Sequence, residues 1–481
     1  MTWRIGVDAG GTFTDVCLFD DSAGRVVVRK VLSTPDDPSR GIALGIEEAI
    51  ARTGAEDAEA MARLPVRATP GPSAGVVGAQ EVARLAGFDA LVSFDMGGTS
   101  THVALLPAGA PADPVTPAGP DIHSVRAGGG SLASVGSDGA LQVGPDSADP
   151  GPACYGSGTA GPTVTDAHLV LGTLNPDTML GGRLQLRQDF SAAAIGALAG
   201  QLGVDVPAAA QAIVAAVTVP VAAAIRAISA QRGQRLGDHT LVAFGGSGPL
   251  HAARLARELG IARILVPRHP GILGAIGQLL TEPRADFSAA GPMDFGADAL
   301  PVIAEAFGLL RHRAAMWFSR EKIPAAARRI TRRVDMRYAG QEWSVSVPVP
   351  DGAVTAATLD ALAAAFAAAC RHTHGVIAGG GKPQFVAFHV EAVGLLPRPG
   401  FQPRAEAGAD AAAARTGSRA VWLPEAGGWV ICPVYDRDRL DAGNSFMGPA
   451  IVEQMDTTTL ILPGMTARVE PYLSLVLDAD A

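Results

Sequence analysis

A short glycine-rich pattern occurs twice in this chain of 481 residues. The segments VDAGGTFTDVCLF (7–19) and FDMGGTSTHVALL (94–106) share the order Asp-x-Gly-Gly-Thr-x-Thr-x-Val, with apolar strand-like residues on both sides. Agreement over so many positions indicates that one supersecondary unit has been duplicated. The chain is therefore predicted to fold into two related halves that face each other.

Each copy of this pattern is suited to bind an anion. A strand that ends in Asp and turns through Gly-Gly-Thr directs several backbone N–H groups into one concave space, and glycine permits the backbone angles that this requires. Hydroxyl groups beside the two turns add further donors: Thr12, Thr14, Thr99 and Ser100. One copy alone could be a tight hairpin in which the Asp forms the turn. Two copies in one chain favour a pair of phosphate-binding loops.

The two aspartates at the head of these turns, Asp8 and Asp95, cannot hold a phosphate group directly, because like charges repel. We expect them to hold Mg²⁺ through water while the ion screens the phosphate oxygens. A third glycine-rich turn, FGGSGPL (244–250), joins a buried strand to a helix, so that the helix N-terminus can face a nucleotide. That turn is a weak signal by itself, but three such turns in this order predict a nucleotide site.

Composition disfavours several classes of partner. The chain has 38 Lys and Arg against 47 Asp and Glu, a net charge of −9, so nucleic acid and anionic membranes would mostly be repelled. The N-terminal residues lack the pattern of a signal peptide, and the apolar stretch 211–225 is too short to span a bilayer. The four cysteines lack the spacing of a disulfide framework or a zinc site. We expect a cytoplasmic protein that binds neither membrane nor nucleic acid.

Periodicity along the rest of the chain predicts four domains. Residues 1–64 hold three strands and one helix, and residues 65–290 contain the second repeat, an Ala-rich helix near 207–230 and the third glycine turn. Residues 291–395 mix helices and strands. Short strands separated by turns predict a small β-rich domain over 396–481.

The order of the three turns resembles the ATPase superfamily that contains actin, sugar kinases and heat-shock chaperones. The resemblance implies an α/β fold in which two duplicated, ribonuclease-H-like lobes close on Mg-ATP, here with a shortened first lobe and a C-terminal β-rich domain. The residues that it assigns to ATP are Gly10, Gly11, Thr12, Phe13, Thr14, Gly97, Gly98, Thr99, Ser100, Gly245, Gly246, Ser247 and Gly248. Within that site Asp8, Thr12 and Asp95 are the expected catalytic residues.

More closely, the chain resembles the A-type members of the hydantoinase/oxoprolinase family. The motifs that carry this resemblance follow one another along nearly the whole chain: GVDAGGTFTDV (6–16), GPSAGVVGAQ (71–80), SFDMGGTSTHVALL (93–106), DIHSVRAGGGSLASV (121–135), DPGPACYG (149–156), GPTVTDAHLVLG (161–172), LVAFGGSGPLHAARLARELGI (241–261), HPGILGAIG (269–277), PVYDRDRL (433–440) and GPAIVEQMDTTTLILPG (448–464). The resemblance implies an enzyme that uses ATP on small amides or ketones.

Members of this family open cyclic amides such as hydantoins or 5-oxoproline by phosphorylating the carbonyl oxygen, so that water can attack. The implied function is therefore that of an ATP-dependent hydrolase subunit that opens a cyclic amide in a hetero-oligomer with a B-type subunit. Two alternatives stay open. One is a subunit of an acetone- or acetophenone-type carboxylase, and the other is a shortened, non-catalytic partner of a full-length homologue.

Two features depart from the family pattern. The second loop carries His102 where relatives usually have Asp, which removes a carboxylate near the metal and predicts a lower ATPase rate. The stretch between Gly54 and the GPSAG segment is much shorter than in relatives and lacks their His-Gly-Thr-Thr motif. We therefore expect lobe one to have an open sheet edge and a partly bare face. Either a partner or the second lobe covers them, or the region is loosely ordered.

A second candidate metal site lies after the second repeat. Asp121 and His123 are two positions apart on an extended segment and so share a face, which suits a divalent ion such as Zn²⁺ or Mn²⁺, and His168 could join them. The alternative is a surface turn with a solvated histidine. His251 is expected to be a packing or helix-surface residue, and Cys154 to be a buried, unreactive thiol.

Overall fold

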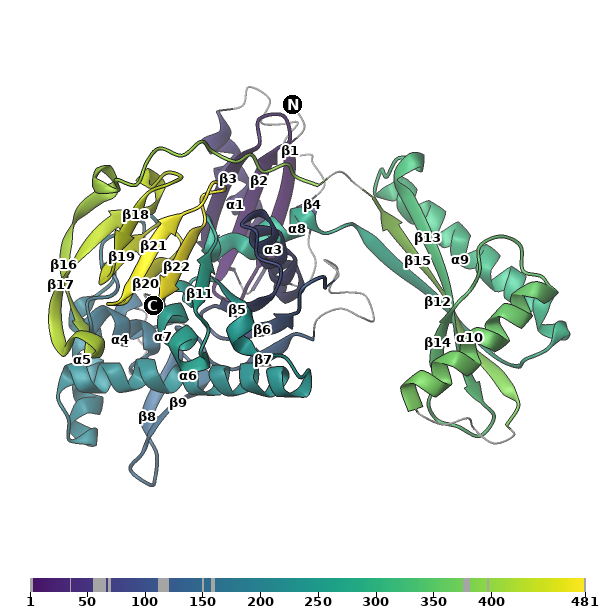
Figure 1. Cartoon of the computed structure of the whole chain (residues 1–481), viewed down its shortest axis with the longest axis horizontal. Helices are drawn as coiled ribbons and strands as arrows, with labels where there is room; N and C mark the ends of the chain where they lie inside the picture. The colour runs from purple at the N-terminus through teal and green to yellow at the C-terminus, as the bar shows by residue number, and fades with distance from the viewer. Residues whose placement is uncertain are drawn as a thin grey trace. The chain divides into compact units, whose positions relative to one another are not determined.

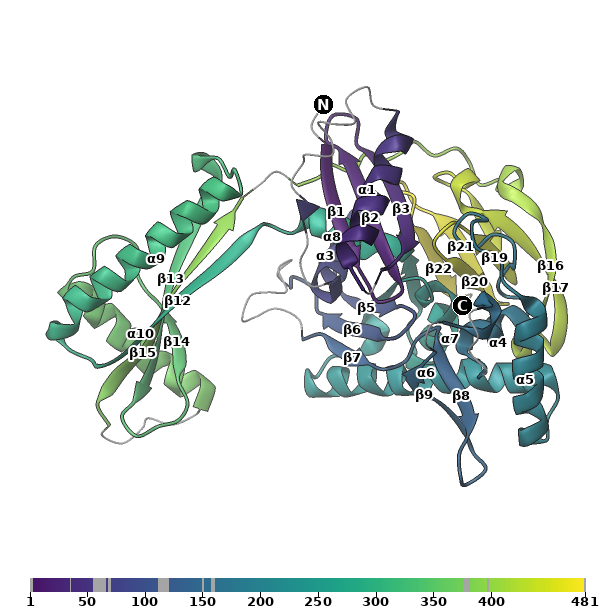
Figure 2. The same cartoon turned by 180° about the vertical axis from the view of Figure 1, so that it is seen from behind.

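The structure is a computed structural model that describes residues 3–34, 36–54, 66–67, 71–110, 121–148, 151–156, 161–374, 381–395 and 398–479. The chain forms two compact units, of which the first combines Met1–Thr281 with Pro399–Ala481 and the second is Glu282–Arg398. Figure 1 and Figure 2 show these units from opposite sides. The predicted domain boundaries at 64/65, 290/291 and 395/396 stay a prediction.

The first repeat forms a small sheet, called lobe 1 here. Its strands are β1 (Trp3–Ala9), β2 (Phe13–Asp20), β3 (Arg25–Leu32) and β4 (Val66–Arg67). They lie in the order β3-β2-β1-β4, in which β1 pairs antiparallel with β2 and parallel with β4. Helix α1 (Pro38–Thr53) begins at its N-cap Asp37 and packs its apolar side on Ile5, Val16 and Val27 of this sheet.

The second repeat forms the sheet of lobe 2, which has the same topology. Its strands are β5 (Leu91–Met96), β6 (Thr101–Leu106), β7 (His123–Val125), β10 (Thr240–Phe244) and β11 (Arg263–Val266). They lie in the order β7-β6-β5-β10-β11, with β5, β6 and β7 antiparallel and β10 parallel to β5. In both lobes the third, second, first and fourth strands are neighbours in that order, so the structure confirms the duplication. Lobe 2 has a fifth strand that lobe 1 lacks among its described residues.

Two helices pack against each other between the two lobes. They are α3 (Gly71–Leu85) and α8 (Leu273–Leu280). Their backbones approach so closely that a Cβ atom added to Gly277 would collide with the carbonyl oxygen of Ala74, and one added to Gly78 would lie 2.9 Å from Leu273 Cγ. Helix α8 also packs on β1, where Gly6 faces the carbonyl oxygen of Ala275. Glycine at these positions is what allows the two lobes to meet.

Helices cover the lobe 2 sheet. They are α4 (Val164–Val170), α5 (Gln188–Leu202), α6 (Val206–Gln231) and α7 (Gly248–Leu259). Figure 1 shows α6 lying along this lobe. By length and composition α6 could cross a membrane, yet 50% of its apolar window is buried inside the structure. Ile213, Val217 and Ile225 belong to the lobe 2 core. Such burial is typical of a core helix in a folded domain.

The C-terminal region is β-rich, as predicted. Strands β16 (Arg415–Leu423), β17 (Gly428–Asp436), β19 (Ala450–Glu453) and β20 (Thr458–Ile461) form one sheet. Three further strands extend the lobe 2 sheet beyond β11: β18 (Ser445–Met447), β21 (Met465–Val469) and β22 (Leu475–Ala479). Because β22 pairs antiparallel with β11, the end of the chain is built into the core of lobe 2.

The second compact unit mixes helices and strands. Strands β12 (Arg284–Asp294), β13 (Arg328–Tyr338), β14 (Val345–Pro348) and β15 (Pro383–Gly394) form an antiparallel sheet in the order β12-β15-β13-β14. Helices α9 (Leu300–Arg320) and α10 (Ala356–His374) accompany it, and Phe307, Phe366 and Phe388 share one core with the strands.

Substitution of Gly277 by Ala should destabilise the first unit. The added methyl group would meet the backbone of α3, which cannot move aside as a flexible side chain could. Overpacking of this kind costs about 1–3 kcal/mol, so we expect a lower urea midpoint for unfolding. Gly200→Ala is the matched control, because nothing lies within 4 Å of its Cβ position, and it should stabilise α5 by up to about 1 kcal/mol. Equal effects of the two changes would contradict the tight helix crossing.

Candidate functional site

The two glycine turns adopt the same local structure. The loop between β1 and β2 is closed by a hydrogen bond from the Gly10 N–H to the carbonyl oxygen of Phe13, at 2.9 Å. The loop between β5 and β6 is closed by the equivalent bond from Gly97 to Ser100, at 3.0 Å. In each case the turn follows the strand that carries the aspartate, Asp8 or Asp95. The repeated pattern in the sequence is thus a repeated turn in the structure.

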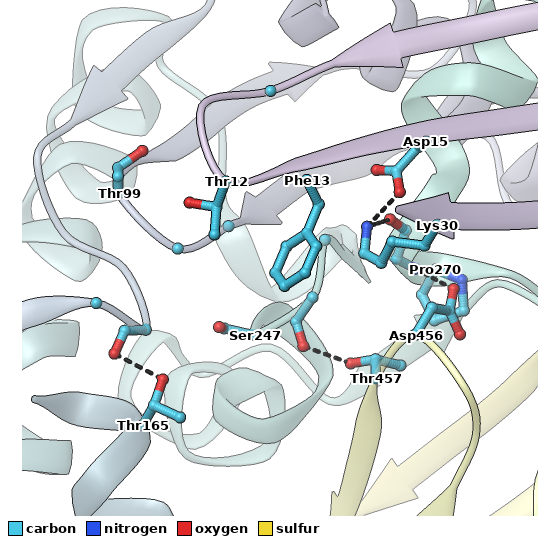
Figure 3. Close-up of a pocket in the computed structure, with 18 of the residues that line it drawn as sticks. Thr12, Phe13, Asp15, Lys30, Thr99, Thr165, Ser247, Pro270, Asp456 and Thr457 are labelled. Atoms are coloured by element: carbon cyan, nitrogen blue, oxygen red, sulfur yellow. Dashed lines mark hydrogen bonds and ion pairs between the residues drawn. The ribbon is translucent and has the colours of Figure 1, made fainter. Parts of the chain in front are cut away.

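The two loops face each other. A Cβ atom added to Gly98 would lie 3.5 Å from Thr12 Oγ1, so the tip of one loop touches the other. Figure 3 shows Thr12 and Thr99 at the same side of a pocket, with Ser247 opposite. This cavity has a volume of about 380 Å³. The predicted residues that line it are Asp8, Gly10, Gly11, Thr12, Phe13, Asp95, Gly97, Gly98, Thr99, Ser100, Gly245, Gly246 and Ser247.

Two predicted ATP-binding residues do not line this cavity. Thr14 is buried, and its hydroxyl lies 3.0 Å from that of Ser33, because alternate residues of β2 point to opposite faces of the sheet. Gly248 is the first residue of α7 and packs against the backbone of Phe94. The part that each lining residue plays in binding stays a prediction.

A glycine triplet, Gly128 to Gly130, packs against the second loop and forms hydrogen bonds with it. The N–H groups of Gly129 and Gly130 donate to the carbonyl oxygens of Gly97 and Gly98, at 3.0 and 2.6 Å. A Cβ atom on Gly128 would lie within 2.8 Å of both of these carbonyls, so a larger residue would push the loop away. Two carbonyl groups of the second loop are therefore engaged by Gly129 and Gly130, which also line the cavity.

Charged residues that the sequence interpretation missed complete the cavity. Asp15, Lys30 and Asp456 line it together with Asp8 and Asp95. The Lys30 ammonium pairs with Asp15, its partner in the β2–β3 register, and donates to the carbonyl oxygen of Gly271 at 2.9 Å. Figure 3 shows this contact beside Phe13. Lys30 is the one Lys or Arg among the described residues that line the cavity.

A backbone link joins these charges across the fold. The N–H of Gly271 donates to Asp456 Oδ2 at 2.9 Å, and Gln454 donates to Asp456 Oδ1 at 2.6 Å. Lys30 of lobe 1 and Asp456 of the C-terminal region thus both hydrogen-bond to the backbone of one residue, Gly271. A signal in the sequence did exist, since Asp15 is part of the first repeat and Asp456 is part of the QMDTTT motif, but neither signal shows which residues meet.

Burial raises the pKa values of the four aspartates that line the cavity. Burial, followed by repulsion from Asp8 and Asp15, raises the pKa of Asp95 to about 7. Burial raises the pKa of Asp15 to about 6, although the Lys30 charge works against this. Burial also raises the pKa values of Asp8 and Asp456. A cation bound in the cavity would relieve this repulsion.

The free carboxylates fit Mg²⁺. Neither Asp8 nor Asp95 makes a hydrogen bond or ion pair with another described residue, so their oxygens are available. Within the part of the chain that the structure describes, no three His, Cys, Asp or Glu side chains form a closed metal site. Mg²⁺ commonly binds in this way, through one or two carboxylates, water and the phosphates of its substrate.

The second candidate metal site receives little support. The Asp121 carboxylate pairs with Arg232 at 2.9 Å, and His123 lies on β7. His168 is not near them: its Nε2 lies 3.1 Å from Nε2 of His251 and its Nδ1 lies 2.8 Å from Thr173 Oγ1. Burial lowers the pKa of His168 well below its usual value, so it packs as a neutral ring. The Zn²⁺ or Mn²⁺ site at 121 and 123 stays a prediction.

His251 and Cys154 are both buried, as packing residues are. Burial lowers the pKa of His251 to about 3 and raises that of the Cys154 thiol well above its usual value. His102, in contrast, lines the cavity beside its cross-strand partner Asp95. Its two ring nitrogens lie 3.1 and 2.9 Å from the hydroxyls of Ser100 and Ser124. Burial lowers the pKa of His102, which favours a neutral imidazole beside Asp95.

Four strands lie in the same order in each lobe, and the glycine-rich turn of each lobe lines one cavity, so the chain has a duplicated α/β fold. Comparison with protein families identifies the particular family. Models of the hydantoinase/oxoprolinase N-terminal region, the hydantoinase/oxoprolinase domain and the hydantoinase/oxoprolinase C-terminal domain match residues 4–65, 53–287 and 294–477. The chain belongs to the hydantoinase/oxoprolinase family.

Individual relatives agree with this assignment. The chain is 31% identical over 425 residues to the alpha subunit of caprolactamase from Pseudomonas jessenii, a match that covers 83% of this chain and 59% of that protein. It is 28% identical over 441 residues to 5-oxoprolinase 1 of Arabidopsis thaliana, covering 85% of this chain and 34% of that protein. This chain therefore spans about 60% or less of the length of these curated relatives.

A solved structure shares the fold. The nucleotide-free structure of acetone carboxylase superposes with a TM-score of 0.84 over 99% of both chains, at 19% sequence identity. At that identity the likeness shows the arrangement of the elements.

The raised pKa values predict how Asp95 affects stability in metal-free, nucleotide-free protein. Native Asp95 holds its proton up to a pKa of about 7, whereas the unfolded side chain releases it near 3.8. The folded state therefore binds more protons between these values, so this group lowers the free energy of unfolding as pH rises from about 4 to 7. Asp95→Asn removes that loss. The variant should gain stability relative to the parent as pH rises through this interval, as measured by urea unfolding.

Asp89→Asn is the control for that measurement, because Asp89 is exposed and lies outside the cavity. It should follow the pH dependence of the parent. A stability difference between Asp95→Asn and the parent that stays constant from pH 4 to 8 would contradict the raised pKa.

Proposed function

We propose that this chain is the ATP-binding subunit of an enzyme that phosphorylates the carbonyl oxygen of a cyclic amide, so that water opens the ring. The observation that carries the proposal is the contact between the two aspartate-headed loops, Thr12 on one and Gly98 on the other, at the wall of one cavity. Membership of the hydantoinase/oxoprolinase family supports the substrate class. The names of the relatives, caprolactamase and 5-oxoprolinase, point the same way.

In this proposal each loop holds part of the triphosphate. Backbone N–H groups and the hydroxyls of Thr12, Thr99 and Ser100 bind the β- and γ-phosphates, and Asp8 and Asp95 hold Mg²⁺ through water. The Gly245–Ser247 turn, at the start of α7, faces the adenosine side. Mg-ATP supplies the phosphoryl group and an electrophilic charge that lowers repulsion in the site.

The chemistry follows from the poor leaving ability of an amide oxygen. The carbonyl oxygen takes the γ-phosphoryl group, the bond between the β- and γ-phosphates breaks, and ADP leaves. Water then attacks the activated carbon, and the ring C–N bond breaks as the nitrogen takes up a proton, which leaves an acyl phosphate. A second water hydrolyses the acyl phosphate to the carboxylate and inorganic phosphate. The loops contribute by positioning the reactants and by stabilising charge.

The proposed enzyme is a hetero-oligomer with a B-type subunit. The matching relative from Pseudomonas jessenii is named as one subunit of its enzyme, which supports this arrangement. A cytoplasmic location remains our expectation. It agrees with the buried, unbridged state of Cys17, Cys154, Cys370 and Cys432.

A ketone carboxylase subunit is the alternative enzyme, and the fold shared with acetone carboxylase favours it as the second candidate. The same loops would then phosphorylate an enol and a carboxylate before a carbon–carbon bond forms. The third candidate is a shortened partner that binds ATP without turning it over, for which His102 and the small lobe 1 sheet are the motivating features.

ATP turnover with a panel of substrates tests the proposal. We expect hydantoin or 5-oxoproline, in the presence of the B-type subunit, to stimulate release of phosphate, and acetone with bicarbonate to have no effect. Asp8→Asn and Asp95→Asn should each lower the stimulated rate about a hundredfold, which is typical of the loss of one group that stabilises transition-state charge. Asp89→Asn should keep the parent rate. Stimulation by the ketone and bicarbonate alone would favour the carboxylase, and ATP binding without turnover under every condition would favour the non-catalytic partner.

His102 should limit the rate of turnover. His102→Asp places a carboxylate beside Asp95 and the metal, as in relatives, so we expect the rate to rise about tenfold, equivalent to about 1.4 kcal/mol of barrier. His102→Asn is the matched control, since it keeps a polar group near Ser100 and Ser124 without adding charge. If His102→Asp were no faster than His102→Asn, the missing carboxylate would not explain a low rate.

A further inference from the structure

A second cavity adjoins the nucleotide site. It has a volume of about 1,120 Å³ and lies within the first compact unit. One wall is the free edge of lobe 1, where five consecutive residues of β3, Arg25 to Arg29, line it. The opposite wall belongs to the C-terminal sheet and includes Glu453 and Asp436. No function proposed above uses this cavity.

The lobe 1 wall carries a cluster of arginines. Arg25, Arg29, Arg52 and Arg183 all line the cavity. One carboxylate, Glu48, serves two of them: Arg29 Nε lies 2.7 Å and Arg183 Nη1 lies 3.2 Å from its Oε2. Burial, followed by the neighbouring charges of Arg29 and Arg52, lowers the pKa of Arg183, although Glu48 works against this. Four guanidinium groups stand against two carboxylates, those of Glu48 and of the exposed Asp177, which leaves an excess of positive charge at this wall.

Arg52, one of the exposed arginines of the cluster, is free to bind a ligand. Among the described residues, no side chain forms a hydrogen bond or ion pair with the Arg52 guanidinium, and Arg25 uses its donors on the backbone carbonyls of Thr53 and Arg52. A guanidinium group presents donors in a fixed plane that matches the two oxygens of a carboxylate. An oxyanion bound at this wall would therefore supply the partner that the Arg52 guanidinium lacks among the described residues.

The acidic residues across the cavity already have cations of their own. Glu453 pairs with Arg419 at 2.6 Å, and Asp438 pairs with Arg268 at 3.2 Å. Asp436 lies 3.3 Å from Arg439. These three charges are thus largely neutralised by Arg419, Arg268 and Arg439, so they do not cancel the excess on lobe 1. Asp456 also lines this cavity and accepts hydrogen bonds from Gly271 and Gln454.

The two cavities meet at Lys30. Arg183 Nη2 donates to the backbone carbonyl of Lys30 at 2.7 Å, while the Lys30 side chain lines the nucleotide cavity. Both cavities also share a set of lining residues: Asn175, Thr178, Leu180, Gln454, Met455 and Asp456. A small molecule held by the arginines would lie beside the path to the phosphate loops.

We propose that the second cavity binds the substrate through a carboxylate, held by Arg52 and Arg183, so that the substrate class is a small amide or ketone that carries a carboxylate group. This rests on the proposed function, which it narrows: neutral lactams and simple ketones lack the group that the arginines recognise. The nucleotide is a second source of an oxyanion in this cavity, because the same guanidinium groups could bind one of its phosphates. The experiment separates these two sources.

The test is a calorimetric titration of the whole chain with a matched pair of probes, with and without a non-hydrolysable ATP analogue and Mg²⁺. 5-Oxoproline and 2-pyrrolidinone share one lactam ring, and only the first carries a carboxylate. We expect 5-oxoproline to bind and 2-pyrrolidinone to bind at least tenfold more weakly. Arg52→Gln and Arg183→Gln should each weaken the binding of 5-oxoproline by about tenfold to a hundredfold, as expected for the loss of a hydrogen bond between charged groups.

Controls decide what each result means. Arg226→Gln removes an exposed arginine that pairs with Glu258 outside both cavities and should leave the affinity unchanged. Arg52 is exposed and engages no side chain among the described residues, so Arg52→Gln should fold even if Arg183→Gln does not. Thermal unfolding of each variant confirms the fold.

Four results would overturn the proposal. The first is equal binding of the two probes, and the second is no binding of 5-oxoproline while the nucleotide analogue binds. The third is an affinity for 5-oxoproline that is unchanged in Arg52→Gln. The fourth is that Arg52→Gln loses binding of the analogue or of inorganic phosphate and keeps binding of 5-oxoproline. Failure of the nucleotide analogue to bind would count against the proposed function. The carboxylate site would still be supported if 5-oxoproline alone bound and Arg52→Gln weakened it.

Discussion

Four carboxylates, those of Asp8, Asp15, Asp95 and Asp456, are held around a single ammonium group, that of Lys30. Burial, and after it the repulsion between neighbouring carboxylates, raises the pKa values of Asp15 and Asp95, so the charged forms of these groups are costly in the absence of a ligand. A divalent cation that arrives with a triphosphate would replace repulsion by attraction. The fold holds these charges in place through rigid elements, namely β-strands on both lobes and the tight crossing of α3 and α8. Much of the structure therefore serves to keep like charges close together.

The paired loops could be predicted from the sequence because the conformation of a turn depends on a few adjacent residues. The same hydrogen bond closes both turns, from Gly10 to Phe13 and from Gly97 to Ser100. The contacts of Lys30 could not be predicted, since Lys30 and Gly271 are 241 positions apart. Thr14 shows a third case: its residue type suited phosphate binding, but strand alternation turns it away from the cavity.

The fold was predicted at the level of its parts, and the connections between the parts were not. The strands of each repeat, the long helix α6 and the β-rich C-terminal region all have local patterns in the sequence. The pairing of β22 with β11 has no such pattern, because both strands are simply apolar. This pairing places the C-terminal residues against lobe 2. It thereby helps to position Asp456, which lines both cavities. The arginine cluster likewise joins α1, β3 and the loop around Arg183, which no single motif links.

The function proposed for this chain depends on a nucleotide that binds as its magnesium complex between the two loops. Calorimetric titration with ATP, in the presence of Mg²⁺ and again in excess chelator, measures this directly. A saturable heat with one nucleotide per chain in Mg²⁺, weakened at least about tenfold by the chelator, is the predicted result. An absence of heat in Mg²⁺, or an affinity that does not depend on the ion, would contradict the claim that the carboxylates at 8 and 95 hold a metal against the phosphates.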